Sequence, residues 1–404
     1  MDLFYKRKNV WEEYNEEQKN KAFTFCDEYM KFLDCSKTER NFVKNACKLA
    51  IKKNFVSCDD IVSGKKKLKS GMKIFGVIKN KAIIFGVLGS EPLEKGFNIV
   101  GAHIDSPRLD LKQNPLYEDT GFGMLKTHYY GGIKKYQWTV IPLSLHGVVI
   151  KKDGKCVDIA IGEDETDPIF TITDLLPHLA QEQMQKKMTE GITGEGLNIL
   201  CGSIPTKGEK KDEVKEKVKK NLLTLLNKKY KIKEEDFISA EIEVVPQFKA
   251  RSIGFDESMI GAYGQDDRAC AYPALEAILS IENPKKTCIC ILTDKEEIGS
   301  VGNTGANANF FETFVEFLFK CSRERYDGYD VRYALSNSRM LSADVNAGVD
   351  PNYDGVQDKR NASYLGNGVV IQKYTGSRGK SGASDANAEY LGYLRNIKLK
   401  KKIL

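Results

Sequence analysis

Thr287-Cys-Ile-Cys-Ile-Leu292 is a short apolar run that leads through Thr293 into Asp294-Lys-Glu296-Glu297-Ile-Gly-Ser300. The run has the length and composition of a buried strand, which places the acidic residues at its C-terminal end. The neighbouring carboxylates of Glu296 and Glu297 repel each other, and a positive centre would allow both to stay ionised. One could then bind a metal while the other acts as general base for a water. A charged surface loop is the alternative.

A histidine and another acid follow a second apolar run. Phe97-Asn-Ile-Val-Gly-Ala102 predicts a buried strand that runs directly into His103-Ile-Asp105. On an extended segment His103 and Asp105 point to the same face, because side chains alternate with a period of two. This arrangement suits a metal-binding imidazole with a carboxylate beside it, although the group that Asp105 orients stays open. An ordinary loop histidine is the alternative.

Two further stretches carry acids. Gly264-Gln-Asp266-Asp267-Arg268 precedes a small-residue segment that predicts a buried helix, where an Asp can simply be an N-cap. Asp344 lies between small residues, where a turn role is the alternative. The four stretches together supply His, Asp, Glu and Asp. Oxygen and imidazole ligands suit zinc, manganese or cobalt, and a bridging Asp suits a two-metal hydrolytic centre with ions roughly 3.5–4 Å apart.

The order of these motifs resembles that of a known family over nearly the whole chain. The resemblance is to the aspartyl aminopeptidase family of di-zinc metallopeptidases, in its bacterial form, and rests on His103-Ile-Asp105-Ser-Pro107, Gln265-Asp266-Asp267-Arg268, Asp294-Lys-Glu296-Glu297-Ile-Gly-Ser300 and Ser342-Ala-Asp344. It implies an α/β fold, with a zinc-exopeptidase-like mixed sheet flanked by helices and an inserted β-rich dimerisation domain. A catalytic domain of residues 1–108 and 240–404 would then surround an insert at 109–239.

The resemblance also implies roles for the acids and the histidine. His103 and Asp344 would bind one metal, Asp266 would bridge, and Glu297 would bind the second metal. Glu296 would be the general base, and Asp105 the carboxylate that supports the histidine, so that these two form the catalytic pair. The implied cofactors are two divalent ions, namely zinc, with cobalt or manganese as alternatives.

The implied activity is an aminopeptidase that removes acidic or neutral N-terminal residues from peptides. Members of the family form homo-oligomers, including dodecamers built from dimers. His178 in Leu176-Pro-His178-Leu-Ala180 is the candidate that would reach a neighbouring subunit's site, and an ordinary helix start is its alternative. Lys373, Arg378 and Lys380 are candidate cations for an acidic substrate residue, or else they form a basic surface loop.

The chain departs from the family near its C-terminus. Members carry another metal-binding histidine after a glycine-rich stretch, and here no histidine follows His178. A helix is predicted to start near Ser384, but the sequence Lys398-Leu-Lys-Lys-Lys-Ile-Leu404 does not match the family. We expect a C-terminus truncated by a frameshift or early stop, with a lysine-rich tail as the alternative. A non-catalytic remnant that binds one metal or joins assemblies is the second function class, and a deacylase or carboxypeptidase is the third.

Composition limits the remaining possibilities. A chain of 404 residues exceeds the usual size of one core, so two domains are expected. The net charge of +6 arises from 62 basic and 56 acidic residues, a balance that favours no nucleic-acid partner. Ten cysteines without a CxxC pair indicate free thiols in a reducing compartment. The N-terminus lacks an apolar signal core and no run reaches the ~18 residues of a membrane span, so we expect a cytoplasmic protein without a membrane partner.

Periodicity predicts several elements around these motifs. Two amphipathic helices fill the first fifty residues, and Ser36 with Glu39 suggests a capping box for the second. Residues 81–88 predict a strand, and residues 136–150 and 156–161 predict a hairpin around Asp153-Gly154. Helical stretches are expected at 175–188 and 213–227. His128 and His146 match no motif and are interpreted as structural.

Overall fold

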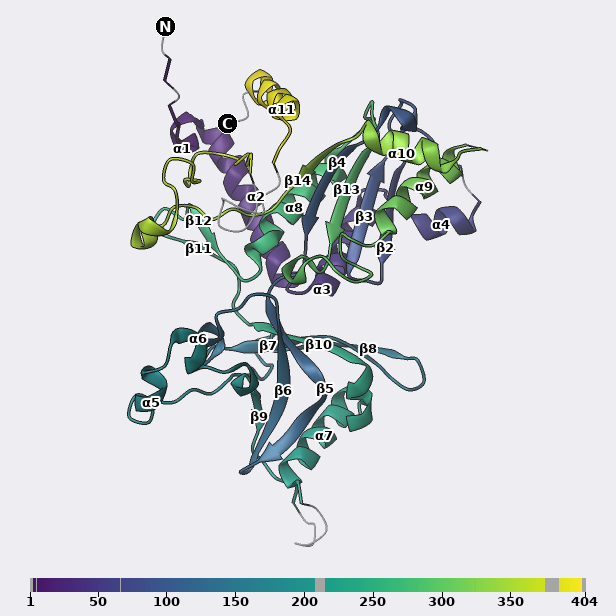
Figure 1. The fold of residues 1–404 in the computed structure, drawn as a ribbon. Coiled ribbons are helices and arrows are strands. Elements are labelled where there is room, and N and C mark those ends of the chain that lie inside the picture. The colour runs from purple at the N-terminus through teal and green to yellow at the C-terminus, as the bar shows by residue number, and fades with distance from the viewer. Residues whose placement is uncertain are drawn as a thin grey trace. The chain divides into compact units, whose positions relative to one another are not determined.

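The structure is a computed structural model that describes residues 3–4, 6–65, 67–207, 215–323, 325–374 and 385–401, with side chains as far as 397 (Figure 1). Contacts divide the chain into two compact units, which are described separately. The smaller unit joins Met1–Glu28 to Val345–Leu404, and the larger unit is Tyr29–Asp344. Within the described residues, no helix combines the length and apolar character needed to cross a membrane.

The helices of the described residues alternate with strands along most of the chain. The α-helices are α1 Val10–Glu13, α2 Glu16–Cys35, α3 Glu39–Lys52, α4 Cys58–Ser63, α5 Gln181–Met184, α6 Met188–Gly191, α7 Lys217–Tyr230, α8 Gln265–Ser280, α9 Phe310–Ser322, α10 Gly328–Ser336 and α11 Ala388–Lys401. The 3₁₀ helices are η1 Leu93–Lys95, η2 Lys135–Trp138, η3 Gly194–Gly196, η4 Glu234–Ser239, η5 Glu296–Ile298 and η6 Pro351–Val356.

A six-stranded mixed sheet, here called sheet A, carries the predicted site. Its strands, in spatial order, are β1 Val56–Ser57, β2 Lys73–Ile78, β3 Ala82–Val87, β13 Cys288–Thr293, β4 Asn98–His103 and β14 Arg339–Ser342. Strand β4 runs parallel to both β13 and β14, whereas β3 is antiparallel to its two neighbours. The predicted strands at 81–88, 97–102 and 287–292 are therefore confirmed, as is the mixed sheet.

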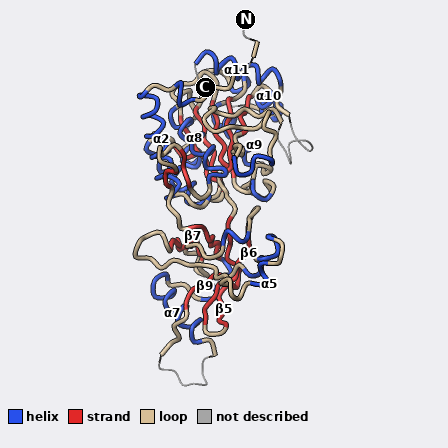
Figure 2. Tube along the Cα trace, turned by 90° about the vertical axis from the view of Figure 1, so that its left-hand side faces the viewer, coloured by secondary structure: helices blue, strands red, loops and turns tan. Residues whose placement is uncertain are grey.

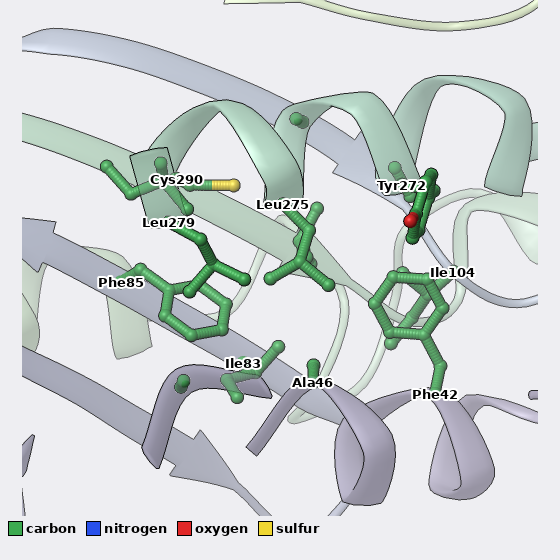
Figure 3. Packing of buried hydrophobic residues seen from close by; sticks show 14 of the residues in the cluster. Phe42, Ala46, Ile83, Phe85, Ile104, Tyr272, Leu275, Leu279 and Cys290 are labelled. Carbon is green, nitrogen blue, oxygen red and sulfur yellow. The ribbon is translucent and has the colours of Figure 1, made fainter. Parts of the chain in front are cut away.

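Helices cover both faces of sheet A because its central strands are apolar on both faces. On β13, Cys290 and Leu292 join a cluster with α3 and α8, while Ile289 and Ile291 join a second cluster with α9 and α10. Figure 3 shows the first cluster, in which Phe42 of α3 and other α3 side chains lie opposite those of α8. The sheet is thus the middle of three layers, as the resemblance implied.

A second six-stranded sheet, sheet B, is entirely antiparallel. Its order is β8 Cys156–Ile161, β7 Leu143–Ile150, β10 Ala240–Pro246, β5 Arg108–Asp119, β6 Phe122–Tyr130 and β9 Ile199–Gly202. It has its own buried cluster, against which α7 packs, and Figure 2 shows its strands grouped separately from those of sheet A. A Cβ at Gly123 of β6 would lie 2.3 Å from Leu222 of α7, so this close approach requires glycine.

Outside the two large sheets, β11 Arg251–Ile253 and β12 Met259–Gly261 form a two-stranded ribbon. In the smaller unit, the side chain of Asn9 caps α1, and the Val10 amide donates to the Gly366 carbonyl at 2.6 Å. Helix α11 begins at Ala388 rather than near Ser384, which lies outside the described residues, and continues to Lys401.

Three sequence predictions about local structure were wrong. Thr38, not Ser36, caps α3, because the Thr38 hydroxyl accepts from the Asn41 amide, while Ser36 accepts from Asn45. Glu39 is buried in an ion cluster and is not available to complete a capping box. Residues 135–138 form η2 ahead of β7, so the first hairpin strand is shorter than predicted. The stretch 175–188 holds only the short helix α5 and the start of α6.

Candidate metal centre

The register of sheet A brings three of the four motifs to one edge. Thr293 pairs with His103 across β13 and β4, and Ser342 pairs with Gly101 across β14 and β4. Because all three strands run in the same direction, the segments that follow them leave the sheet at the same edge. Asp344, two residues beyond Ser342, therefore reaches the level of His103.

His103 is held by its own neighbour. Its Nδ1 atom lies 3.2 Å from Asp105 Oδ1 and 3.1 Å from the Asp105 carbonyl oxygen. These contacts occupy one ring nitrogen and leave Nε2 directed at Asp266, whose Oδ1 is 3.1 Å away. Asp105 thus orients His103, which answers the question that the sequence left open. Such a carboxylate partner fixes the tautomer of a metal-binding imidazole.

The fourth motif enters at the start of α8. Asp266 and Asp267 come shortly after Gly264, whose φ is 76°. A Cβ at Gly264 would lie 1.9 Å from the Arg268 side chain, so this position requires glycine. The Ser106 hydroxyl donates to the Asp266 carbonyl at 2.7 Å. Asp267 is fully buried, whereas the Asp266 side chain is 57% exposed. Neither residue is the N-cap of α8, because that position is Gly264.

Glu296 and Glu297 lie on η5, immediately after β13. Asp105 accepts hydrogen bonds from both of their backbone amides, at 3.2 Å each. Asp294, at the end of the strand, is buried and accepts from the Thr304 hydroxyl at 2.7 Å. Asp294 therefore stabilises the loop, while the side chains of Glu296 and Glu297 are available for chemistry. Glu296 Oε2 lies 3.8 Å from His103 Nε2.

Two groups of side chains have ligand atoms close enough for one metal ion each. His103, Asp266 and Glu297 form one group, and His103, Asp267 and Asp344 form the other, with ligand atoms within 4.8 Å of one another in each. Both carboxylate oxygens of Asp267 and Glu297 Oε1 are buried without a hydrogen bond of normal geometry from the described residues. A bound cation would satisfy these oxygens, so the donor set fits a divalent metal.

Electrostatics also favour a cation at this place. Burial, and after it the nearby Asp266 carboxylate, raises the pKa of Glu297 to about 7. Burial likewise raises the pKa of Asp267 to about 7, against the opposing influence of Cys270 and His103. The pKa of Glu296 is also raised, mainly by burial. Carboxylates that lack compensating positive charge favour protons, and a metal ion would replace those protons.

The His103 imidazole shows the same imbalance. Burial lowers its pKa, but hydrogen bonds to Asp105 and Asp266 outweigh burial and raise the pKa to about 11. The proton on Nε2 therefore occupies the position that a metal would take. Because an imidazole nitrogen has one lone pair, His103 can complete only one of the two groups. A carboxylate has two oxygens, so an Asp is the better candidate to bridge two ions.

The structure brings six of the predicted site residues together. They meet at the edge of sheet A and are His103, Asp105, Asp266, Glu296, Glu297 and Asp344. His178 is exposed in a turn before α5 and belongs to neither ligand group. Lys373 lies in the smaller unit, where its ammonium faces the Tyr374 ring, and Arg378 and Lys380 lie outside the described residues.

Two residues near the site had no role in the sequence interpretation. Asp267 is the neighbour of Asp266 in the same motif. This adjacency is the signal that could have marked it as a candidate ligand. Tyr130 donates its hydroxyl to Asp105 Oδ2 at 2.6 Å, and no local pattern marks it, because it comes from sheet B. The predicted structural histidines are elsewhere: His146 contacts Glu163 at 2.8 Å, and His128 stacks on Tyr129.

A cavity of about 720 Å³ adjoins the metal groups at Asp266. Its lining combines Ser106 and Pro107 with two loops, one before β7 and one between β10 and α8. The side chains are mostly apolar or neutral, including Trp138 and Phe248, and Lys134 is the one cation in the described lining. A peptide chain could therefore approach the metal groups from this side.

The sequence from residue 32 to residue 403 matches the model of the aminopeptidase I zinc metalloprotease family, M18. The chain belongs to the M18 family. A probable M18 family aminopeptidase 1 of Clostridium acetobutylicum is 52% identical over 402 residues, covering 100% of this M18 chain and 86% of that protein. With this membership and this named relative, the chain is a metallo-aminopeptidase.

Solved structures show the same fold. The M18 family aminopeptidase from Thermotoga maritima superposes with a TM-score of 0.92 at 45% identity, covering 99% of this M18 chain and 86% of that one. The mApe1 dodecamer of Saccharomyces cerevisiae has a TM-score of 0.66 at 23% identity, covering 84% and 76%. At that identity the yeast protein shows the fold alone.

Proposed function

We propose that this M18 aminopeptidase removes N-terminal residues from peptides with a two-metal centre, in which Glu296 is the general base. The observation that carries the proposal is the convergence of two ligand groups on His103, with orphaned buried carboxylate oxygens in both. Asp266 would bridge, His103 and Asp344 would complete one ion site, and Glu297 would serve the other. Asp267 is an additional candidate ligand beside Asp344.

Zinc ions bound here would polarise the scissile carbonyl and lower the pKa of a water; cobalt or manganese could supply the same chemistry. Glu296 has the position of a proton acceptor, since its carboxylate lies beside the metal groups and is half exposed toward the solvent. Its raised pKa suits a group that first takes a proton and then returns it to the leaving amine. Glu297 and Asp266 would hold the free N-terminal amine of the peptide by charge.

The neutral lining of the cavity supports cleavage after neutral N-terminal residues, and Lys134 leaves acidic residues as the second candidate class. To separate the two classes, kcat/KM is measured for two substrates that share one leaving group and carry either leucine or aspartate as the N-terminal residue. Activity on N-blocked or C-terminal substrates would instead support a deacylase or carboxypeptidase.

Metal stoichiometry tests the centre itself. We expect two ions per chain together with hydrolysis of an aminoacyl reporter. One ion or none without turnover would support the non-catalytic remnant. Asp266→Asn should lower the stoichiometry by at least one ion and abolish turnover, because a bridging carboxylate serves both sites. Asp267→Asn is the comparison variant, because it makes the same change at the neighbouring residue. If Asp267→Asn still binds two ions per chain, the bridging role belongs to Asp266.

We further propose that residues 169–188, which connect β8 to β9 of sheet B within the predicted insert 109–239, form a homo-oligomer interface. Apolar side chains at Ile169, Leu175, Leu176, Leu179, Met184 and Met188 are each more than half exposed. These apolar residues lie within one stretch of 20 residues, and exposed apolar surface that gathers in one place is typical of an interaction site. His178 lies in the same stretch. The yeast protein of the same fold is a dodecamer.

Sedimentation velocity tests this interface. Leu179→Asp should reduce the assembled mass, since it places a charge in an apolar contact. Leu225→Asp on α7 is the control, because Leu225 is also more than half exposed but lies outside residues 169–188. A monomeric wild-type chain would reject the proposed interface.

A further inference from the structure

Tyr130 links sheet B to the metal centre. It is the last residue of β6, its side chain is buried, and its hydroxyl donates to Asp105 Oδ2 at 2.6 Å. A hydroxyl bound to a carboxylate at this distance forms one of the stronger kinds of hydrogen bond. Tyr130 therefore restrains the carboxylate that itself orients His103.

The Asp105 carboxylate divides its contacts between its two oxygens. Oδ1 faces His103 Nδ1 at 3.2 Å and accepts from the Glu296 amide. Oδ2 accepts from Tyr130 and from the Glu297 amide. A rotation of this carboxylate would disturb the histidine ring and the backbone that carries both glutamates. Without the Tyr130 hydroxyl, Oδ2 would keep only the Glu297 amide among these donors.

The Tyr130 ring is held in turn by Arg108. Arg108 pairs with Tyr130 across β5 and β6, and its guanidinium carbon lies 3.9 Å from the ring centroid. Arg108 is itself buried and bound by three acids: Asp110 of its own strand at 2.9 Å, Glu243 of β10 at 3.2 Å and Glu39 of α3 at 3.6 Å. These contacts leave Tyr130 little freedom to turn away from Asp105.

We propose that Tyr130, clamped by Arg108, is a positioning residue through which sheet B sets the geometry of the metal centre. Sheet B would then contribute to metal binding in addition to any role in assembly. Tyr130 acts on His103 only through Asp105, and this route distinguishes it from a residue that merely stabilises the fold. The inference rests on the proposed metal centre at His103.

The test is a double-mutant cycle on zinc affinity. Tyr130→Phe, Asp105→Asn and the double variant are stripped of metal and titrated with zinc against a competing chelator. We expect Tyr130→Phe to weaken zinc binding by about 10- to 100-fold, the range typical of groups that orient a ligand. If Tyr130 acts through Asp105, the double variant should bind no more than about threefold weaker than Asp105→Asn alone, because coupled residues are not additive.

Tyr129→Phe is the matched control. It removes the same hydroxyl one residue earlier on β6, from a side chain that is 45% exposed, and should leave zinc affinity unchanged. Wild-type affinity in Tyr130→Phe, or a double variant whose loss is the product of the two single losses, would overturn the inference. Failure of the wild-type chain to take up zinc would instead reject the proposed metal centre on which the inference rests.

Discussion

Asp266 and Asp267 are adjacent in the chain but lie in different environments. The Asp266 carboxylate is half exposed and faces His103 Nε2. The Asp267 carboxylate is buried and belongs with Asp344. Two acids of the same motif therefore belong to different ligand groups. Identical residue types thus acquire distinct chemistry from burial and from the charged groups beside them.

Glu296→Gln should reduce kcat by about 10²- to 10⁴-fold, because the amide cannot accept the proton that a general base removes. Glu296 belongs to neither ligand group, so the metal content should stay at the wild-type value. Kinetics and elemental analysis of the same sample measure both quantities. Glu312→Gln, an exposed change on α9, is the control. Full activity in Glu296→Gln would remove this residue from the mechanism.

Among the elements, α3 is fixed to both sheets. Its Phe42 packs in the cluster between α3, sheet A and α8 (Figure 3), and its first residue, Glu39, pairs with Lys81 of the β2–β3 turn at 2.9 Å. Lys37, just before the helix, contacts Glu163 after β8 at 2.9 Å. The helix therefore connects the layer that carries the metal groups to sheet B.

Phe42→Ala should lower the free energy of unfolding by about 3–5 kcal/mol, because the fully buried ring would leave a cavity in a close-packed cluster. Urea denaturation followed by circular dichroism gives this difference. Phe255→Ala removes the same ring from a fully exposed position and should change the free energy by less than about 0.5 kcal/mol. Equal effects of the two substitutions would show that the α3 cluster is not packed as described.

Glu163→Gln should destabilise the protein at neutral pH but not in acid. Glu163 is partly buried, and its bonds to His146, Ser144 and Lys37 outweigh burial and lower its pKa to about 2. A carboxyl whose pKa falls on folding stabilises the protein above its unfolded pKa, and this contribution is lost between about pH 4.5 and pH 2. We expect a loss on the order of 2 kcal/mol at pH 7.

Denaturant unfolding of the wild type and Glu163→Gln at several pH values checks this result. The two curves of stability against pH should converge as the pH falls toward 2. Glu165→Gln, two residues away and exposed, is the control. A constant difference across that range would mean that the Glu163 carboxylate is not the source of the effect.

For the whole molecule, metal binding and stability should be linked. His103 and the acids of its two ligand groups come from four separate segments of the larger unit, so an ion that binds them holds distant parts of the chain together. At a free ion concentration 100 times Kd, binding should add about 2.7 kcal/mol to the free energy of unfolding. Chelation should lower Tm, and added zinc should restore it, as measured by calorimetry. A Tm insensitive to chelation would contradict metal binding to the folded chain.

The strands at 81–88, 97–102 and 287–292 could be predicted because continuous apolar runs are typical of buried strands, and that signal is local. The short helices in 175–188 could not, because the apolar residues Leu175, Leu176, Leu179, Met184 and Met188 stay exposed and do not pack along one face of a longer helix. The capping of α3 depended on where Glu39 is buried, which involves Lys81 and Arg108 far along the chain. Local patterns predicted the elements better than their ends.

The sequence by itself determined the chemistry of this protein: the order of the acidic motifs, their place after apolar runs and the family to which they belong. These are properties of residues close together in the chain. Only the tertiary structure decided that Asp105 faces His103 Nδ1, that Asp267 is buried near Asp344, and that Tyr130 from sheet B reaches Asp105. Strand register and packing create these contacts, because they bring together residues that lie far apart in the chain.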